Sequence, residues 1–211
     1  MRSWRARARV TGGRDEGDDY REEDGLHDAI QQNIENLAVH NAIARPIIIL
    51  CAAALVYLLA AAWLLVVARH QDRLSWAVAA RIIGMGILAY VASKVLSGIV
   101  IDPRPYLVTH THPLIATARD NGFPSDHVLL VAWLTASLWW IDRRWAPAFV
   151  AGVVLVMIGR LGVGAHHTLD VLGSVAIVIV AALVARAIPL PARWSAPLFP
   201  TRRALDRAGR R

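Results

Sequence analysis

This chain of 211 residues is predicted to be an all-α membrane protein: a polytopic bundle of about five membrane-spanning helices preceded by one amphipathic helix. Three observations predict this fold class. Hydrophobic residues make up 56% of the chain, which is more than an ordinary soluble domain carries. These residues are gathered in long runs that approach the length needed to cross a bilayer. The charged residues lie between the runs and in the two tails.

The net charge of +7 comes almost entirely from arginine, since Lys94 is the only lysine. A basic chain can bind nucleic acid, but here the arginines cluster at the ends of apolar runs, a pattern that suits anionic lipid head groups better. We therefore expect a membrane lipid partner and no nucleic acid. Cys51 is the only cysteine, which excludes an internal disulfide framework and a thiolate metal site.

Three regions follow from the composition of the chain. Residues 1–25 join an arginine-rich block to an acidic block with almost no apolar content, which predicts a disordered tail. Residues 26–190 are expected to form one membrane-embedded domain, and residues 191–211 a basic, frayed C-terminal tail. At the start of the domain, apolar residues recur at helical spacing over residues 26–44, which predicts an amphipathic helix at the membrane surface.

The five predicted spans are separated by short basic or polar connections. The first span is uncharged and opens with Pro46, a position that helices tolerate. The second contains Arg81 near one end and Lys94 toward the other, and the third follows Ser125, a plausible N-cap. The expected boundaries are residues 46–68, 76–101, 126–141, 146–164 and 171–188.

An odd number of spans places the two ends of the chain on opposite sides of the membrane. Connections 69–75 and 142–145 then share one side with the C-terminal tail, and they are richer in arginine than the opposite side. The positive-inside rule predicts that this side is cytoplasmic. The chain is therefore expected in the cell membrane, with its two internal polar segments, residues 102–127 and 160–170, facing the extracytoplasmic side.

These two polar segments hold the candidate functional residues. His166 and Asp170 are four residues apart, so on a helical turn they share a face and the carboxylate can hold the imidazole in one tautomer. Arg104 lies between two prolines, which limit where its guanidinium can go. His127 lies in the first turn of a helix whose free N–H groups, with the Ser125 hydroxyl, would form an anion site.

Such a set would hold a phosphate group and supply one nucleophile and one acid. Neither segment contains a carboxylate cluster of the kind that chelates magnesium. We therefore expect no metal and no cofactor. His110, His112 and Arg119 in the first segment could contact a second phosphate or a lipid head group, or could simply be solvated.

The order of these residues resembles the signature of the type 2 phosphatidic acid phosphatase family. That signature is Arg-Pro, then Pro-Ser-x-His, then an arginine, a histidine and an aspartate at fixed spacing. In this chain it corresponds to Arg104-Pro105, Pro124–His127, Arg160, His166 and Asp170. The acidic-Pro-Arg-Pro-aromatic opening and the Phe-Pro-Ser-Asp-His element are similar to the bacterial undecaprenyl pyrophosphatase branch associated with bacitracin resistance.

The resemblance implies a helical-bundle phosphatase that works without a metal. His166 would attack the terminal phosphate to give a phosphohistidine, and Asp170 would orient it. His127 would protonate the leaving group and later activate water. The implied phosphate ligands are Lys94, Arg104, Ser125 and Arg160.

Two positions depart from the family pattern. The family lysine falls where this chain has Ser97, and Lys94 lies three residues earlier. On a helix this shift keeps roughly the same face but moves the amine by about 4.5 Å along the axis. The usual glycine of the second element is Asp126 here, which could bind an incoming basic or hydroxyl group of the substrate, or could cap the helix.

The function expected from this resemblance is hydrolysis of undecaprenyl or another polyprenyl diphosphate to the monophosphate, which recycles the lipid carrier of cell-wall synthesis. A phosphatase for phosphatidylglycerophosphate, phosphatidic acid or a decaprenyl-linked phosphoribose phosphate is the alternative within the same chemistry. A non-catalytic lipid-binding protein of the same fold is another. A histidine-ligated metal or haem protein fits less well, because the histidines lie among arginines, which repel a cation.

Overall fold

The computed structural model describes residues 28–199. The predicted disordered tail at residues 1–25 and the last part of the predicted C-terminal tail lie outside this range. The described chain forms eight α-helices and three short 3-10 turns. The helices are α2 (Ala29–His40), α3 (Ala44–Ala53), α4 (Leu55–Arg69), α5 (Trp76–Ser97), α6 (Pro105–Val108), α7 (Asp126–Ile141), α8 (Ala146–Gly162) and α9 (Thr168–Ala187).

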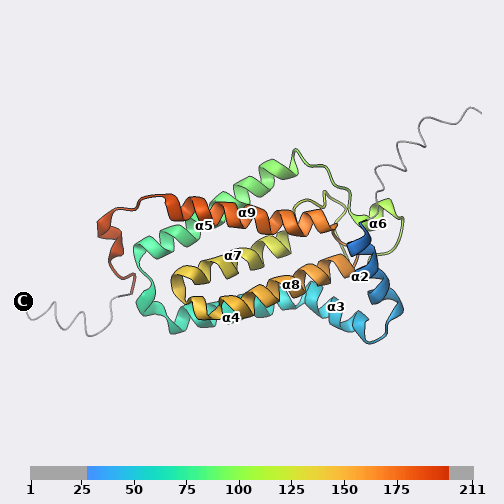
Figure 1. Cartoon of the computed structure of the whole chain (residues 1–211), viewed down its shortest axis with the longest axis horizontal. Coiled ribbons are helices and arrows are strands. Elements are labelled where there is room, and N and C mark those ends of the chain that lie inside the picture. Colours follow the sequence, from blue (N-terminus) through green and yellow to red (C-terminus); the bar gives the residue numbers. More distant parts are fainter. Residues whose placement is uncertain (1–27, 200–211) are drawn as a thin grey trace, which may run out of the picture.

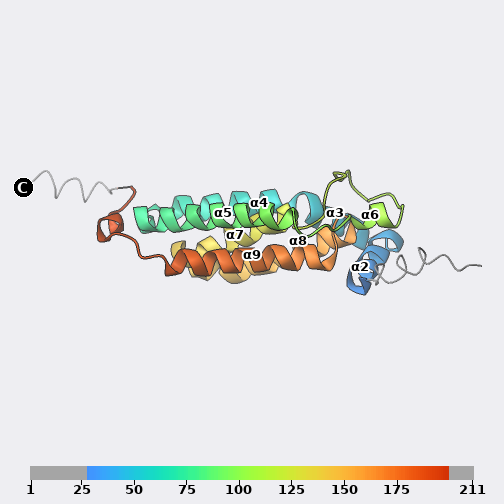
Figure 2. The ribbon, with the colours of Figure 1, turned by 90° about the horizontal axis from the view of Figure 1, so that it is seen from above.

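Five long helices run along the bundle in alternating directions, in the order α4, α5, α7, α8 and α9 (Figure 1). Seen from above, α4 and α5 lie on one side and α8 and α9 on the other, with α7 between them (Figure 2). Helix α7 contacts all four of these neighbours. Residues 98–125 and 163–167 connect helices at one end, called the site end below. Residues 70–75 and 142–145 do so at the opposite, basic end.

The lengths of the helices agree with most of the predicted spans. Three helices of the described chain are long and apolar enough to cross a membrane: α5, α9, and α8 together with the 3-10 turn that precedes it. Helices α3 and α4 pass the same test only as a pair. Helix α7 has the expected boundaries, but its 16 residues make it a shorter apolar helix. An all-α membrane bundle is therefore confirmed, with α7 as its central helix.

The first predicted span is not one straight helix. It is divided into α3 and α4, which meet at an angle of 52°. No proline or glycine lies within residues 47–69, so the sequence carried no kink signal. The two halves have different partners, since α3 packs mainly on α8 and α4 mainly on α7. The contact of α3 with α8 is close, because a Cβ atom on Gly159 would lie 2.5 Å from the backbone nitrogen of Ala52.

The predicted amphipathic helix is shorter than expected and packs on the bundle rather than lying apart from it. Helix α2 contacts α8 and α3, and it buries Gln31 and Ala38. Its N-cap, Asp28, accepts a hydrogen bond from the backbone N–H of Gln31. The same carboxylate accepts from the N–H and hydroxyl of Thr168. Asp28 therefore links α2 to the start of α9, directly beside the second polar segment.

The first part of the C-terminal tail is also ordered, contrary to the expectation of a frayed end. After a 3-10 turn at Ala192–Ser195, the chain returns to the start of α5. The N–H of Trp76 donates to the carbonyl of Ala196 at 3.2 Å, and the N–H of Leu198 donates to Leu74 at 2.7 Å. The side chain of Leu198 packs against the apolar cluster at the basic end.

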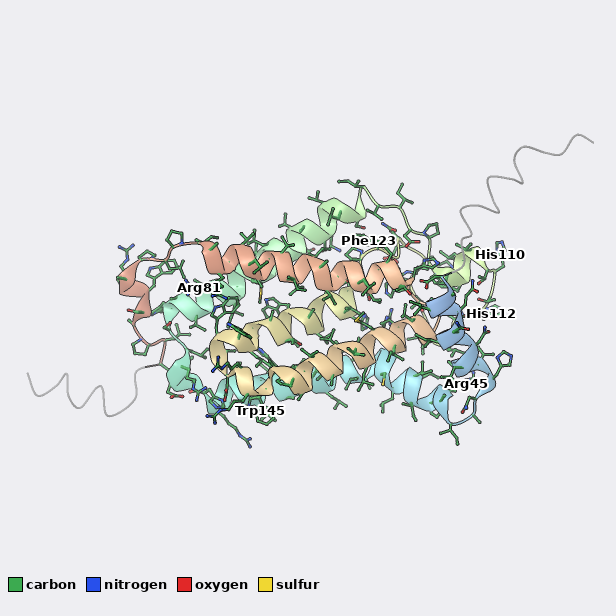
Figure 3. All side chains as sticks on the ribbon, viewed as in Figure 1. Arg45, Arg81, His110, His112, Phe123 and Trp145 are labelled. Atoms are coloured by element: carbon green, nitrogen blue, oxygen red, sulfur yellow. The ribbon has the colours of Figure 1, made fainter. Side chains whose placement is uncertain are left out.

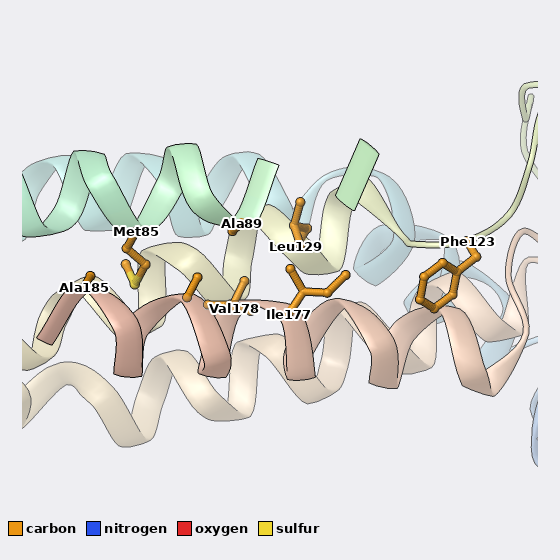
Figure 4. Packing of buried hydrophobic residues seen from close by; sticks show 9 residues of the cluster. Met85, Ala89, Phe123, Leu129, Ile177, Val178 and Ala185 are labelled. Atoms are coloured by element: carbon orange, nitrogen blue, oxygen red, sulfur yellow. The ribbon is translucent and has the colours of Figure 1, made fainter. Parts of the chain in front are cut away.

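One apolar cluster reaches from the middle of the bundle to the site end. Met85, Ala89, Ile177 and their neighbours pack where α5, α7 and α9 meet, and Phe123 closes the cluster at the site end (Figure 4). Gly173 leaves room for the ring of Phe123, since a Cβ atom there would overlap it. The packed ring therefore anchors the loop that leads directly into α7.

Candidate active site

A cavity of about 410 Å³ opens at the site end. Its wall combines segments that are far apart in the sequence: the bend between α3 and α4, the loop before α7, the first turn of α7, the end of α8 and the loop before α9. The lining residues that carry polar side chains are Tyr57, Arg104, Thr117, Asp120, Asp126, His127, Arg160 and His166. Five of the eight site residues predicted from the sequence therefore line this cavity: Arg104, Asp126, His127, Arg160 and His166.

His166 lies at the bottom of this cavity with only 2% of its side chain exposed. Its Nδ1 is 2.9 Å from the carbonyl oxygen of Gly122 and 3.3 Å from Oδ2 of Asp170. A carbonyl can only accept, so Nδ1 carries the proton and donates it. The lone pair of the ring is therefore on Nε2. The predicted pairing of His166 with Asp170 is present, with Gly122 as a second and nearer acceptor.

Two guanidinium groups surround Nε2 of His166. Nη1 of Arg104 lies 3.2 Å from it and Nη2 of Arg160 lies 3.4 Å from it. Arg104 is also held by Asp120, whose Oδ1 accepts from Nε and Nη2 at 3.0 and 2.7 Å. Nη1 of Arg104 in addition donates to the carbonyl of Ala165 at 3.0 Å. Arg104 is thus fixed by protein groups before any ligand arrives.

Arg160 differs from Arg104 in having no counter-ion. It is only 6% exposed, and across residues 28–199 it forms no ion pair with a carboxylate. Its Nε is buried without a hydrogen-bond partner. A buried, unpaired cation is unfavourable, and Arg160 lines the same cavity as His166. The arrangement is suited to binding an anion.

The surroundings of His166 also decide its charge. Burial, together with the positive charges of Arg160 and Arg104, lowers the pKa of His166 to about 3. The imidazole is therefore neutral at pH 7, and Nε2 keeps the lone pair that a nucleophile needs. A neutral nucleophile between two cations can take up a phosphoryl group, because the guanidinium donors can move from Nε2 to the phosphate oxygens.

The start of α7 brings two further predicted residues to the cavity. His127 is partly buried and Asp126 is exposed, and both line it. Ser125, in contrast, is fully buried and is not among the lining residues. Ser125 is the N-cap of α7 but makes no side-chain cap, and its hydroxyl has no hydrogen-bond partner among the described residues. The predicted roles of Ser125 as cap and as phosphate ligand therefore have no contact to support them here.

Lys94 is not brought to the site. Its side chain is exposed on α5, and its Nζ lies 5.4 Å from the centre of the Tyr90 ring. It lines neither this cavity nor the neighbouring one. Ser97, which stands at the family lysine position, faces the loop instead, where Nδ2 of Asn121 donates to its carbonyl and lies 3.3 Å from its Oγ. The three-residue displacement therefore removes the amine from the phosphate site.

Sequence reasoning missed the groups that hold the two polar segments together. Residues 102–104 pair with residues 120–122: the N–H of Asp102 donates to the side chain of Asn121, and the N–H of Gly122 donates to the carbonyl of Asp102. This pairing brings Arg104 and the carbonyl of Gly122 to opposite ring nitrogens of His166. The sequence does not show which backbone groups will form hydrogen bonds. Only the glycine at position 122 indicated that the backbone approaches another group closely there.

Asp102, His167 and Asp170 form the one described group whose ligand atoms could approach a shared metal ion, all lying within 4.8 Å of one another. The group lies beside the cavity rather than in it, because none of its members lines the cavity. Its ligand atoms already face one another, with Nδ1 of His167 3.0 Å from Oδ1 of Asp102. These side chains can therefore satisfy their charges without an ion.

The sequence can now be placed among known proteins. A family model described as PAP2 superfamily matches residues 74–194, which is more than half of the chain. The chain belongs to the PAP2 superfamily. The matched PAP2 region runs from the residue before Ser75 to the 3-10 turn after α9, and it contains every predicted site residue. The resemblance to phosphatidic acid phosphatases is confirmed.

A curated relative narrows the comparison within the PAP2 superfamily. Undecaprenyl-diphosphatase BcrC of Bacillus subtilis (strain 168) is 30% identical to the chain over 95 residues. The aligned part is 45% of this chain and 49% of the relative, so the chain spans about half the length of the relative it matches. This similarity supports the predicted branch of the PAP2 superfamily. No solved structure matches the chain.

Proposed function

We propose that this protein is a membrane lipid phosphatase that hydrolyses undecaprenyl or another polyprenyl diphosphate to the monophosphate. The reaction would recycle the lipid carrier of cell-wall synthesis. The observation that carries the proposal is the convergence of Arg104 and Arg160 on Nε2 of His166, at 3.2 and 3.4 Å. The choice of lipid is supported by the relative described as undecaprenyl-diphosphatase.

In the first step, the terminal phosphate enters the cavity and its oxygens accept from Arg104 and Arg160. Nε2 of His166 attacks the phosphorus, and the bond from phosphorus to the bridging oxygen breaks. The leaving group is the lipid monophosphate, and His127, which lines the same cavity, donates a proton to its oxygen. The product on the enzyme is a phosphohistidine.

In the second step, a water molecule attacks the phosphorus of the phosphohistidine. His127, now neutral, removes a proton from this water, and the bond between phosphorus and Nε2 breaks to release inorganic phosphate. The ring of His166 carries positive charge while it is phosphorylated. The carbonyl of Gly122 and the carboxylate of Asp170, at 2.9 and 3.3 Å from Nδ1, stabilise that charge and keep the ring oriented.

The position of the cavity favours a phosphate that is attached to a lipid. Ala53 and Tyr57 line it at the bend between α3 and α4. The side chain of Tyr57 is 71% exposed, on a helix pair apolar enough to lie in a membrane. A phosphate bound beside His166 can therefore stay connected to a chain that leaves past this bend into the bilayer.

We further propose that the site faces the extracytoplasmic side of the cell membrane. His110 and His112 lie at the site end of the bundle, whereas Arg81 and Trp145 lie at the opposite end (Figure 3). Connections 70–75 and 142–145, which hold the arginines that the positive-inside rule weighs, are also at that opposite end. Labelling the Thr111→Cys variant with a membrane-impermeant thiol reagent tests this orientation. We expect labelling in intact cells; labelling only after lysis would place the site on the cytoplasmic side.

The proposed activity is tested by measuring phosphate release from purified protein in detergent with EDTA present. Undecaprenyl diphosphate is compared with phosphatidic acid and phosphatidylglycerophosphate. We expect the polyprenyl diphosphate to be preferred, and His166→Ala and His127→Ala to abolish release while the protein still folds. His40→Ala, on an exposed residue of α2, is the matched control. Preference for a glycerolipid would assign the enzyme a glycerolipid phosphate as its substrate. Full activity of either histidine variant would refute the catalytic role of that histidine.

A further inference from the structure

A second histidine–carboxylate pair, formed by His167 and Asp102, lies next to His166 and outside the cavity lining. Nδ1 of His167 is 3.0 Å from Oδ1 of Asp102, and their side chains are only 24% and 19% exposed. Neither residue lines the cavity where the phosphate would bind. The proposed reaction assigns no role to either residue, although both are next to groups that hold the nucleophile.

The pair is connected to the nucleophile through Asp170. The backbone N–H of His167 donates to Oδ2 of Asp170 at 2.9 Å, the same oxygen that lies 3.3 Å from Nδ1 of His166. Asp170 is completely buried, and its Oδ1 has no hydrogen-bond partner among the described residues. The ligand atoms of Asp102, His167 and Asp170 all lie within 4.8 Å of one another.

Two carboxylates this close repel each other strongly in a buried site unless a positive charge lies between them. The imidazolium of His167 can supply that charge. Its nearest carboxylate is Asp102, with the carboxylates of Asp170 and Asp28 close enough to favour its charged form as well. On its own segment, His166 is neutral at pH 7 and adds no opposing charge.

Asp102 supports the nucleophile by a second route through the backbone. Its carbonyl accepts from the N–H of Gly122 at 2.8 Å, and the carbonyl of Gly122 in turn accepts from Nδ1 of His166 at 2.9 Å. Both acceptors that Nδ1 of His166 uses, Gly122 and Asp170, are therefore held in place by the pair of Asp102 and His167.

We propose that Asp102 and His167 are positioning residues for the phosphatase reaction: their ion pair holds Asp170 and Gly122 where they orient His166. This inference rests on the proposed function. It assigns His167 a role as a cation that neither reacts nor touches the phosphate. It also gives a role to Asp102, the acidic residue at the start of the first polar segment, because its carboxylate contacts His167 in the second segment.

If the pair must be charged to position His166, the phosphatase activity should depend on pH. The Asp102 carboxylate, which faces Nδ1 of His167, raises the pKa of that imidazole against the opposing effect of burial. The pKa of Asp102 is lowered, because its bond and attraction to His167 outweigh the effect of burial. The pair is therefore charged below the raised pKa of His167, and it is lost as the pH rises through that pKa. Activity should decline over the same range.

The test substitutes Asp102→Asn, which keeps the size and the backbone bonds of this residue but removes its charge. We expect kcat to fall by about 10-fold to 100-fold, as for other groups that orient a reacting residue, with KM changed less than threefold. The basic side of the pH profile of kcat should shift to lower pH. The double variant Asp102→Asn/His167→Gln should be no worse than the more damaged single variant, because the two residues act as one unit.

A second measurement does not depend on turnover. Histidine titration by NMR in detergent should show the pKa of His167 falling in Asp102→Asn, while Asp72→Asn, an exposed carboxylate at the basic end, leaves it unchanged. An unchanged kcat and pH profile in Asp102→Asn, with wild-type turnover present, would overturn the inference and leave the proposed function standing. Absence of turnover in the wild type would instead reject the proposed function.

Discussion

Replacing Arg160 with methionine should lower the phosphatase activity and at the same time raise the stability of the fold. Arg160 is 6% exposed, its Nη2 lies 3.4 Å from Nε2 of His166, and its Nε has no partner. Methionine has a similar reach but no charge and no donors. The substitution therefore removes a phosphate-binding group and, with it, a buried cation that forms no ion pair with a carboxylate of residues 28–199.

The two effects have opposite signs. Removing one preorganised donor from a transition-state oxyanion costs about 10²-fold to 10³-fold in kcat, and an arginine aimed at a transferring phosphoryl group contributes about 10³-fold or more. We expect kcat/KM to fall by about 10³-fold. Burying an unpaired ion costs several kcal/mol. After discounting for the lost bond to His166 and for water in the cavity, we expect the variant to be about 1 kcal/mol more stable.

The assay pairs phosphate release with thermal unfolding in detergent, followed by tryptophan fluorescence. Added inorganic phosphate should raise the Tm of the wild type, since a ligand at 100 times its Kd stabilises a protein by about 2.7 kcal/mol. Arg160→Met should lose that response, whereas Arg186→Met, at an exposed position on α9, should keep it. Activity within tenfold of wild type, or destabilisation beyond about 2 kcal/mol, would refute the assignment of Arg160 as an unpaired anion-binding group.

Two further predictions concern the support and the charge of His166. A Cβ atom on Gly122 would lie 3.0 Å from Oδ2 of Asp170, so Gly122→Ala should displace that carboxylate and lower kcat by about 10-fold to 100-fold. The control is Gly84→Ala, whose added Cβ meets nothing within 4 Å and should leave kcat unchanged. Equal kcat values for the two variants would contradict the predicted role of Gly122. Because burial and the two arginines lower the pKa of His166 to about 3, the unfolded chain binds a proton below about pH 6.5 that the folded chain does not. The Tm should therefore fall from pH 6.5 toward pH 3, and less steeply in His166→Ala; parallel curves would show that His166 is not the cause.

The fold was predictable where the sequence carried a periodic or apolar signal. Apolar runs predicted helices α5, α7, α8 and α9 with boundaries that differ little from those observed. The bend between α3 and α4 was not predictable, because it arises from packing against two different helices rather than from a proline or glycine. The order of residues 196–198 was missed for a similar reason, since it depends on backbone bonds to Leu74 and Trp76.

The site was predictable to the extent that it consists of side chains in a recognisable order. Arg104, Arg160 and His166 meet as the motif implied, because the spacing of the motif fixes which helix ends they occupy. Lys94 was misplaced, because a shift of three residues along α5 leaves the amine on its exposed face. Gly122 and the pairing of Asp102 with His167 were missed, because they depend on how two distant loops pack.

If His166 carries the phosphoryl group during turnover, the phosphohistidine can be trapped and located. Purified protein is mixed with polyprenyl diphosphate labelled with ³²P in the terminal phosphate, quenched in alkali, and digested for mass spectrometry. We expect an acid-labile, alkali-stable phosphate on the peptide that contains His166, and no such phosphate in His166→Ala. A label on another residue, or turnover in His166→Ala, would contradict it.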